Sequence, residues 1–277
     1  MKIKFNMKTN LIIFIFFVAI TSITALVTSH FLNSDKGVRI NETLIQGEEP
    51  ISNEILKYLA KKNIETNLPK KDLEAIYWVE RIKEGGLILL FRHSEREKWN
   101  NTVEGFDIYE LSNNLDARNE SWYRATCLTD KGIEESKLIF EAIKHAQIRI
   151  SEVISSPSCR ARETSLYAFG RIDKTFSGLL HYTAFNPLDR KQIGKELKKS
   201  VLELNIEKDK NIILSAHNKV ISHYDFIDLM KVGEGLEESG FYVIEKKGND
   251  LIVPFKFSKI KNFIILLYRH EFEKSEK

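Results

Sequence analysis

The pattern of apolar and polar positions changes along the chain, and its first feature is a long apolar run near the amino terminus. Residues 11–27 contain no charged side chain, three lysines precede them, and the first acidic residue is Asp35. Extended to residue 32, the run approaches the roughly 20 apolar residues that a helix needs to cross a bilayer. A secretory signal sequence is the alternative, although small residues are not arranged as in a typical cleavage site. We expect an uncleaved transmembrane helix over 11–32.

The charges around this run predict how the chain is oriented. Lysines keep the preceding segment in the cytoplasm, so residues 1–10 form a cytoplasmic basic tail and the rest of the chain lies outside. Residues 33–51 are polar and have no periodicity, which is typical of a tether. A folded domain is expected over 52–277, either anchored to the membrane or, if the signal is cleaved, secreted or periplasmic.

Within 52–277, apolar positions at helical spacing alternate with short apolar runs that are typical of buried strands. Ser52 and Thr129 are expected to cap helices, and Gly85 and Gly170 to end them. In the helix that follows Thr129, Ile139, Phe140 and Ile143 are expected to face inward with Ile133. The predicted helices are 53–62, 69–84, 129–146, 161–169, 186–204 and 220–230, and the predicted strands are 87–91, 153–154 and 212–214.

This alternation predicts an α/β fold, in which a mostly parallel sheet is covered by helices on both faces as a three-layer α/β/α domain. The carboxyl-terminal part differs. Residues 241–245 and 251–257 are joined by Gly-Asn-Asp, which predicts an antiparallel hairpin added to the sheet. The pattern over 260–268 fits a strand or a helix.

Composition narrows the class of protein. The 277 residues are 43% hydrophobic and 29% charged, as in globular proteins, and the net charge of +3 is spread along the chain. We therefore expect no nucleic-acid partner. Cys127 and Cys159 are too few for a disulfide scaffold and lack the spacing of a zinc site, so no metal is expected. An oxidising compartment would leave them either as free thiols or as one disulfide.

The candidate chemistry lies directly after three of the predicted strands. The segments are FRHSER at 91–96, SSPSCRARET at 155–164 and SAHN at 215–218. Open α/β sheets bind their ligands at the carboxyl ends of the strands. Each segment brings an arginine or a histidine to that edge, so the three are expected to form one site.

These segments resemble the histidine phosphatase superfamily, which also contains the cofactor-dependent phosphoglycerate mutases. The family's R-H-G-E run stands here as Arg92-His93-Ser94-Glu95, and its L-T-x-x-G helix start as residues 128–132. Its S-S-P-x-x-R-A-x-x-T segment spans 155–164, and its late histidine is His217. The match covers residues 86–246. Ser94 replaces the usual glycine, and Asn218 stands where many relatives have glycine or an acid.

The chemistry of these side chains supports phosphoryl transfer. Arg92 and Arg160 offer the fork geometry that binds phosphate oxygens. Their positive charges disfavour a second proton on His93, which leaves a nitrogen lone pair to attack phosphorus and form a phosphohistidine. His217 is expected to donate a hydrogen bond to the transferring oxygens.

Three further residues are predicted to bind substrate, and a proton donor is not evident. Glu95, Arg96 and Asn218 adjoin the catalytic residues in sequence. Arg92 and Arg96 are expected to lower the pKa of Glu95, which suits an acceptor better than an acid. Asp189 and Glu234 are weak candidates for the proton donor. Without a donor, we expect a preference for phosphates whose leaving groups have a low pKa.

Two classes of function remain from the sequence alone. The first is a phosphatase that acts through a phosphohistidine, without a cofactor, on a small-molecule or protein-borne phosphate. The second is an inactive relative that binds a phosphorylated ligand or partner, suggested by Ser94 and the missing acid. A mutase is a third and weaker alternative. The segments 97–127 and 171–190 are expected to determine the substrate.

Overall fold

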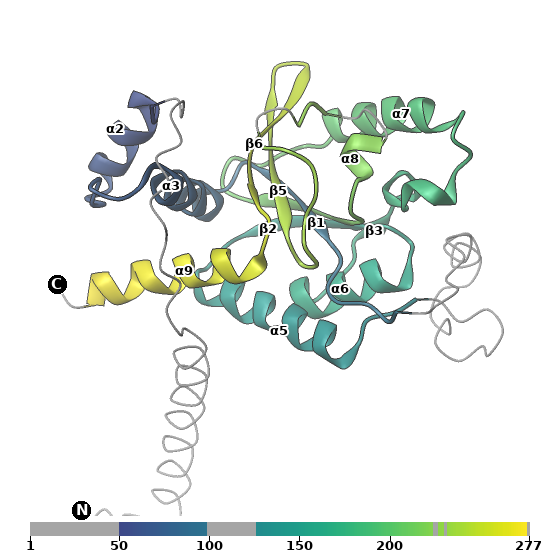
Figure 1. The fold of residues 1–277 in the computed structure, drawn as a ribbon, viewed down its shortest axis with the longest axis horizontal. Coiled ribbons are helices and arrows are strands. Elements are labelled where there is room, and N and C mark those ends of the chain that lie inside the picture. Colours follow the sequence, from purple (N-terminus) through teal and green to yellow (C-terminus); the bar gives the residue numbers. More distant parts are fainter. Residues whose placement is uncertain (1–49, 99–125, 224–226, 230–231, 276–277) are drawn as a thin grey trace, which may run out of the picture. The chain divides into compact units, whose positions relative to one another are not determined.

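The structure is a computed structural model that describes residues 50–98, 126–223, 227–229 and 232–275 (Figure 1). The predicted membrane segment, the basic tail and nearly all of the tether lie outside these ranges. Within them, no helix is both long and apolar enough to cross a bilayer. The described helices and strands are α2 (Asn53–Lys61), α3 (Lys70–Glu84), β1 (Ile88–Arg92), α5 (Asp130–His145), β2 (Ile150–Ser155), α6 (Cys159–Phe169), β3 (Lys174–Thr175), α7 (Arg190–Leu202), β4 (Asn211–Ala216), α8 (Val220–His223), β5 (Phe241–Lys247), β6 (Asp250–Phe257) and α9 (Ile260–Ser275), with 3₁₀ turns η1 (Ser177–Leu179) and η2 (Tyr182–Ala184).

The strands of the described residues form one six-stranded sheet in the order β3-β2-β4-β1-β5-β6. The first four in this order are parallel, and β5 and β6 add an antiparallel hairpin beside β1. The predicted α/β fold with a mostly parallel sheet is therefore confirmed. Arg92 lies beside Ala216, and Ser155 beside Ser215. The strands β1, β4 and β2 consequently end at the same edge.

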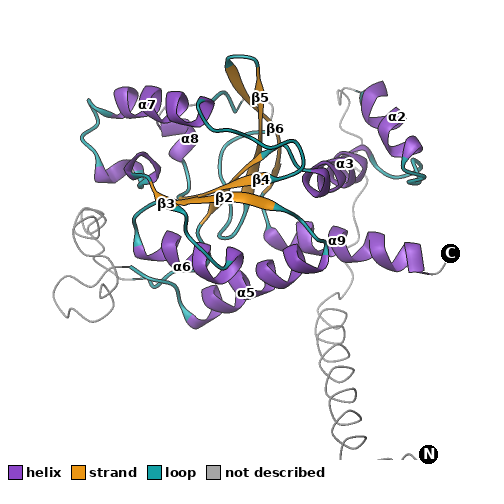
Figure 2. Cartoon of the chain, turned by 180° about the vertical axis from the view of Figure 1, so that it is seen from behind, coloured by secondary structure: helices purple, strands orange, loops and turns teal. Residues whose placement is uncertain are grey.

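Apolar side chains cover both faces of the sheet. In β1, Leu89 and Phe91 belong to a buried cluster with side chains of α3, α5, α6 and α9. Ile88 and Leu90 point the other way, into a cluster with side chains of α7 and α8. Because neighbouring strand residues face opposite sides, a strand with helices on both faces is apolar throughout. Figure 2 shows the helices on either side of the sheet.

The predicted helix ends are confirmed where the sequence supplies capping residues. The side chain of Ser52 accepts a hydrogen bond from the amide of Ile55 at 3.2 Å. Thr129 caps α5 in the same way. Gly85 and Gly170 end α3 and α6 with φ angles of 96° and 75°, a region that side chains with a Cβ rarely adopt.

The prediction that Phe140 faces inward is wrong. The buried residues of α5 are Gly132, Ser136, Ile139, Ala142 and Ile143, whereas Phe140 is 37% exposed. A helix turns by about 100° per residue, so a face centred on Ile139 and Ile143 carries Phe140 out to its margin. One turn before Ile139, the inward position is held by Ser136, a small polar residue.

Two predicted helices are shorter in the structure. Helix α7 starts at Arg190, because the Asn186 side chain accepts from the amide of Leu188 at 3.1 Å and forms a turn before the helix. The described part of α8 spans Val220–His223, and Ile227 and Leu229 are buried residues outside any helix. Residues 260–275 form a helix, which settles the open alternative there.

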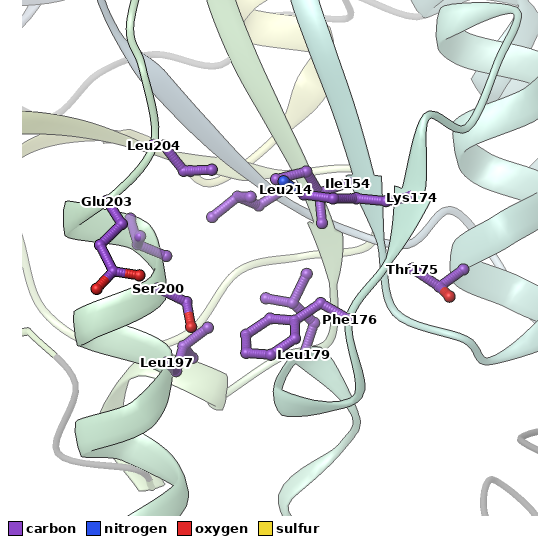
Figure 3. A pocket seen from close by; sticks show the side chains of 11 residues that line it. Ile154, Lys174, Thr175, Phe176, Leu179, Leu197, Ser200, Glu203, Leu204 and Leu214 are labelled. Atoms are coloured by element: carbon purple, nitrogen blue, oxygen red, sulfur yellow. The ribbon is translucent and has the colours of Figure 1, made fainter.

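A cavity of about 290 Å³ lies between α7 and the sheet (Figure 3). Its walls are mostly apolar, with Leu197 and Val201 from α7 and Ile154 and Leu214 from the sheet. None of the predicted site residues lines it. The candidate chemistry is therefore separate from this cavity.

Candidate active site

The four predicted catalytic residues meet at the carboxyl edge of the parallel strands. Arg92 ends β1 and His93 follows it, His217 follows β4, and Arg160 lies in the first turn of α6 after β2. The ring centroids of His93 and His217 are 5.3 Å apart. His93, Arg160 and His217 are all buried. The predicted juxtaposition of these residues is therefore present.

The hydrogen bond of His93 determines which of its nitrogens can attack. Nδ1 lies 2.8 Å from the carbonyl oxygen of Ser94. A carbonyl oxygen only accepts hydrogen bonds, so Nδ1 carries the proton and donates it. In the neutral ring, the lone pair is then on Nε2. This is the tautomer that a nucleophilic histidine needs.

Burial is the main reason that His93 stays neutral. It lowers the pKa of His93 well below its ordinary value, and the positive charges of Arg160, Arg92 and Arg96 lower it further. The expected effect of the guanidinium groups is present, but it is secondary to burial.

His217 is held by two hydroxyl groups. Its Nε2 lies 3.1 Å from the Oγ atoms of both Ser156 and Ser158. Burial, followed by the charge of Arg160, lowers the pKa of His217 well below its ordinary value, so its ring is also neutral. A hydroxyl that donates to Nε2 leaves the proton on Nδ1, which is buried and has no hydrogen-bond partner among the described residues. This Nδ1–H is available to a phosphoryl oxygen.

Both lowered pKa values predict a loss of stability in acid. The unfolded chain binds protons at these histidines below pH about 6.5, whereas the folded chain does not. The free energy of unfolding is therefore expected to fall by about 2 kcal/mol per histidine between pH 7 and pH 5. Urea unfolding at several pH values measures this fall. His93→Asn, whose amide can still donate to the Ser94 carbonyl, should show a smaller fall, and an unchanged one would contradict the assignment.

Ser94, which stands where the sequence motif usually has glycine, is buried in a network of hydroxyl groups. Its Oγ lies 2.8 Å from Ser136 Oγ of α5 and accepts a hydrogen bond from Ser239 Oγ at 2.8 Å. Its amide donates to Thr164 Oγ1 of α6 at 2.9 Å. The hydroxyl of Ser94 is thus bonded within the protein, and Ser94 joins the segment 92–95, here called the catalytic segment, to α5 and α6.

All three predicted substrate-binding residues make contacts within the protein, and Arg96 donates through Nη1 to the Glu97 carbonyl at 3.0 Å. Glu95 accepts hydrogen bonds from Lys131 and from Thr129. The pKa of Glu95 is lowered mainly by the bond from Lys131, so attributing this to Arg92 and Arg96 was wrong. Asn218 Oδ1 accepts from the amide of Leu236 at 3.1 Å.

Gly132 packs against the backbone of the catalytic segment. A Cβ atom at this position would overlap the carbonyl oxygen of Glu95 and lie 2.9 Å from its carbonyl carbon. Gly132→Ala is therefore expected to lower the free energy of unfolding by about 2 kcal/mol, since backbone atoms cannot move aside easily. Urea unfolding tests this. Glu134→Ala, at an exposed position of the same helix, is the control, and equal stability of both variants would contradict the prediction.

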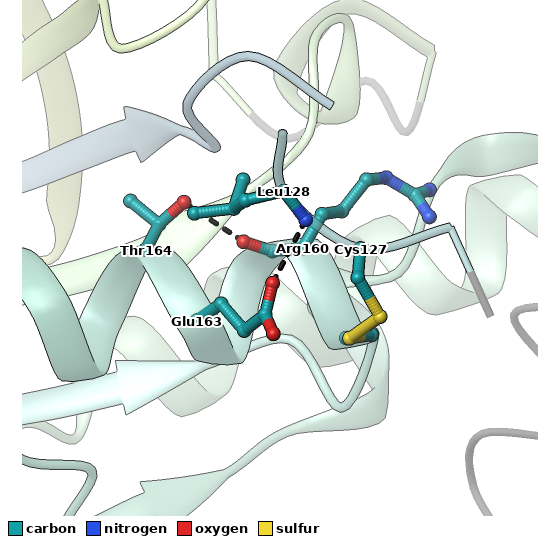
Figure 4. Close-up of a disulfide and its surroundings, with 6 residues drawn as sticks. Cys127, Leu128, Arg160, Glu163 and Thr164 are labelled. Atoms are coloured by element: carbon teal, nitrogen blue, oxygen red, sulfur yellow. Dashed lines mark hydrogen bonds between the residues drawn. A yellow bond between two sulfur atoms is a disulfide. The ribbon is translucent and has the colours of Figure 1, made fainter. Parts of the chain in front are cut away.

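The cysteines form a disulfide beside Arg160 (Figure 4). Cys127 and Cys159 have Cα atoms 5.0 Å apart, and the amide of Leu128 donates to Glu163 Oε2 at 2.8 Å. The sulfur atoms lie within 4.8 Å of the Glu163 carboxylate, but a disulfide does not provide the thiolate ligands of a metal site. The disulfide thus joins residue 127 to the start of α6, where Arg160 is placed.

Breaking this disulfide is expected to destabilise the domain. The bond closes a loop with a sequence separation of 32 residues, for which the chain-entropy model gives about 4 kcal/mol. Urea unfolding of the Cys127→Ser/Cys159→Ser variant against the parent measures the effect. Thiol titration of the denatured, unreduced protein should find no free thiol, and two thiols would show that the bond is absent.

Two residues near the site were missed by the sequence reasoning. The ring centroid of His181 is 5.8 Å from that of His217. Glu238 Oε1 lies 3.3 Å from Arg92 Nη2. Neither residue belongs to a motif, and both come from segments without clear periodicity. The only available signal was their chemical type.

No protein-family model and no curated protein matches the sequence. Among solved structures, the protein histidine phosphatase SixA in complex with tungstate is 12% identical, with 64% of this chain and 99% of that chain covered and a TM-score of 0.43. A phosphoserine phosphatase from Entamoeba histolytica, in complex with 3-phosphoglyceric acid, is 13% identical, with 62% and 97% covered and a TM-score of 0.39. A mycobacterial glucosyl-3-phosphoglycerate phosphatase is 13% identical, with 58% and 90% covered and a TM-score of 0.38.

Proposed function

We propose that the chain is a phosphatase of the histidine phosphatase type, which forms a phosphohistidine at Nε2 of His93. One observation carries this proposal: the donation from His93 Nδ1 to the Ser94 carbonyl directs the lone pair of a buried, neutral ring to Nε2. Arg92, Arg160 and His217 surround that ring with groups that bind phosphate oxygens. A purely structural histidine does not require this set of neighbours.

In the first step, Nε2 of His93 attacks phosphorus and the bond from phosphorus to the ester oxygen breaks. The electron pair of that bond stays on the leaving oxygen, which takes up a proton. Arg92 and Arg160 stabilise the charge on the three other oxygens, and Nδ1–H of His217 donates to one of them. In the second step, water attacks the phosphohistidine and gives up a proton, the phosphorus–nitrogen bond returns its electrons to Nε2, and inorganic phosphate leaves.

A binding module without activity is less well supported than it was from sequence alone. That alternative was suggested in part by the serine at position 94. The Oγ of Ser94 is bonded to Ser136 and Ser239, so it does not require a change in the chemistry of His93. The intact histidine pair favours catalysis.

Turnover of p-nitrophenyl phosphate by the full-length chain in detergent tests the proposal. We expect steady hydrolysis and a phosphoenzyme that is labile in acid and stable in alkali, as phosphoramidates are. Hydrolysis without a phosphoenzyme after rapid quenching under single-turnover conditions would contradict the covalent mechanism. Binding of phosphate without hydrolysis would favour the binding module.

The domain is further proposed to lie outside the cytoplasm, anchored by residues 11–32. The uncharged run with its preceding lysines supports an anchor, and the Cys127–Cys159 disulfide is typical of oxidising compartments. Protease added to intact cells or spheroplasts that produce the chain should digest the domain. Protection of the domain until the membrane is permeabilised would reverse the topology.

A further inference from the structure

Residues 236–240, here called the 236–240 segment, are bonded to the catalytic residues through the backbone. The amide of Arg92 donates to the Gly240 carbonyl at 2.9 Å, and the amide of Ser239 donates to the His93 carbonyl at 3.1 Å. The Arg92 side chain donates through Nη1 to the Leu236 carbonyl at 2.6 Å. Glu238 is therefore held beside Arg92 and His93, although it is distant from both in the sequence.

The side chain of Glu238 accepts a hydrogen bond from Arg92, one of the residues proposed to bind phosphate. Its Oε1 lies 3.3 Å from Nη2 of Arg92, and the side chain is 24% exposed. Arg92 is next to the nucleophile and is expected to bind a phosphoryl oxygen. A carboxyl group that contacts the phosphate-binding guanidinium and still reaches solvent can meet the leaving group of a bound substrate.

Burial is the main reason that the protonated form of the Glu238 carboxyl is favoured. Burial raises the pKa of Glu238 above its ordinary value, Arg92 and Arg96 oppose this, and Glu95 and Glu135 add to it. Lys131 lies between the latter two acids and pairs with both. The adjacent Glu237 pairs with Lys259 at 3.1 Å.

Substrate binding is expected to raise the pKa of Glu238 further. A phosphate dianion places negative charge beside Arg92, and it competes with Glu238 for the N–H groups of Arg92. A like charge nearby disfavours a carboxylate, so the bound dianion raises the pKa of Glu238 further. The group therefore gains a proton when it is needed by the leaving oxygen.

We propose that Glu238 is the proton donor of this enzyme, an inference that rests on the phosphatase function proposed above. As the phosphorus–oxygen bond breaks, the Glu238 carboxyl gives its proton to the leaving oxygen. In the second step, its carboxylate accepts a proton from the water that attacks the phosphohistidine. This assignment replaces Asp189 and Glu234, and it removes the expected restriction to substrates with low-pKa leaving groups.

The test compares leaving groups in the full-length Glu238→Gln variant, which keeps the size of the side chain. Ethyl phosphate needs a proton donor, whereas p-nitrophenyl phosphate leaves as a stable anion. We expect Glu238→Gln to lose about 10²–10³-fold in kcat/KM on ethyl phosphate and only a few-fold on p-nitrophenyl phosphate. Glu237→Gln is the matched control and should behave as the parent on both.

A different result is expected if Glu238 is only a counter-ion that positions Arg92. Loss of such a residue would change kcat/KM by the same factor for both substrates, and this outcome, or no change, would overturn the assignment of Glu238 alone. A parent enzyme that fails to hydrolyse p-nitrophenyl phosphate would overturn the phosphatase function and the assignment together. The two failures are therefore distinguishable.

A second measurement does not depend on turnover. Calorimetric titration with inorganic phosphate, in buffers of different ionisation enthalpy, counts the protons taken up on binding. The parent is expected to take up protons that Glu238→Gln does not, because phosphate binding protonates Glu238. Equal uptake by both proteins would overturn the proposal.

Discussion

Replacing His93 by alanine is expected to lower kcat/KM toward p-nitrophenyl phosphate by about 10⁴-fold or more, because the covalent intermediate is lost. His93 is the residue whose hydrogen bond through Nδ1 leaves a lone pair on Nε2 at the centre of the site. His217 has its Nε2 engaged by Ser156 and Ser158, so it is a poor substitute nucleophile. Steady-state kinetics and trapping of the phosphoenzyme measure the effect.

The control for this variant is His145→Ala, at an exposed position at the end of α5. It should retain the activity and the phosphoenzyme of the parent. Circular dichroism and urea unfolding must show that His93→Ala is folded, because His93 is buried. A folded His93→Ala protein with substantial activity would refute the proposed nucleophile.

The sheet was predictable because its central strands are short, continuous runs of apolar residues. The residues of β1 are apolar on both faces, since Leu89 and Phe91 meet one layer of helices and Ile88 and Leu90 the other. Such a run has few alternatives to a buried strand. By contrast, the phase of α5 depends on Ser136, a polar residue at a buried position, which the apolar pattern does not reveal.

The core of the site was predictable for a geometric reason. Neighbouring parallel strands bring their carboxyl ends together, so residues that directly follow β1, β2 and β4 meet without knowledge of any loop. Glu238 and His181 do not follow a parallel strand. Their positions depend on hydrogen bonds made by long connecting segments, such as the bond from Leu236 to Asn218, and sequence patterns carry no information on these.

The structure also changes the interpretation of Asn218. Its position after His217 suggested contact with substrate, but its side-chain oxygen accepts from the start of the 236–240 segment. That segment in turn carries Glu238 to Arg92. Asn218 is therefore better described as a positioning residue, and its effect on catalysis would pass through Glu238.

Arg160 gives the second large effect, and it tests the phosphate clamp separately from the nucleophile. Arg160→Ala is expected to lower kcat/KM by about 10³-fold, because a buried guanidinium no longer stabilises charge on the transferring oxygens. Removing its charge also relaxes the pKa of both histidines upward, since Arg160 follows burial as the next cause of their lowered values. The variant should therefore lose activity at a higher pH than the parent when the solution is acidified.

Arg160→Lys separates charge from geometry at this position. Lysine keeps the positive charge but lacks the planar fork. Compared with Arg160→Ala, the pH profile of Arg160→Lys should therefore return closer to that of the parent than its kcat/KM does. Arg162→Ala, two residues further along α6, is the matched control and should behave as the parent. The measurement is kcat/KM for p-nitrophenyl phosphate from pH 4 to pH 8. If Arg160→Ala and Arg162→Ala have equal effects, Arg160 does not bind the phosphoryl group, and the clamp must be sought in Arg92 and Arg96.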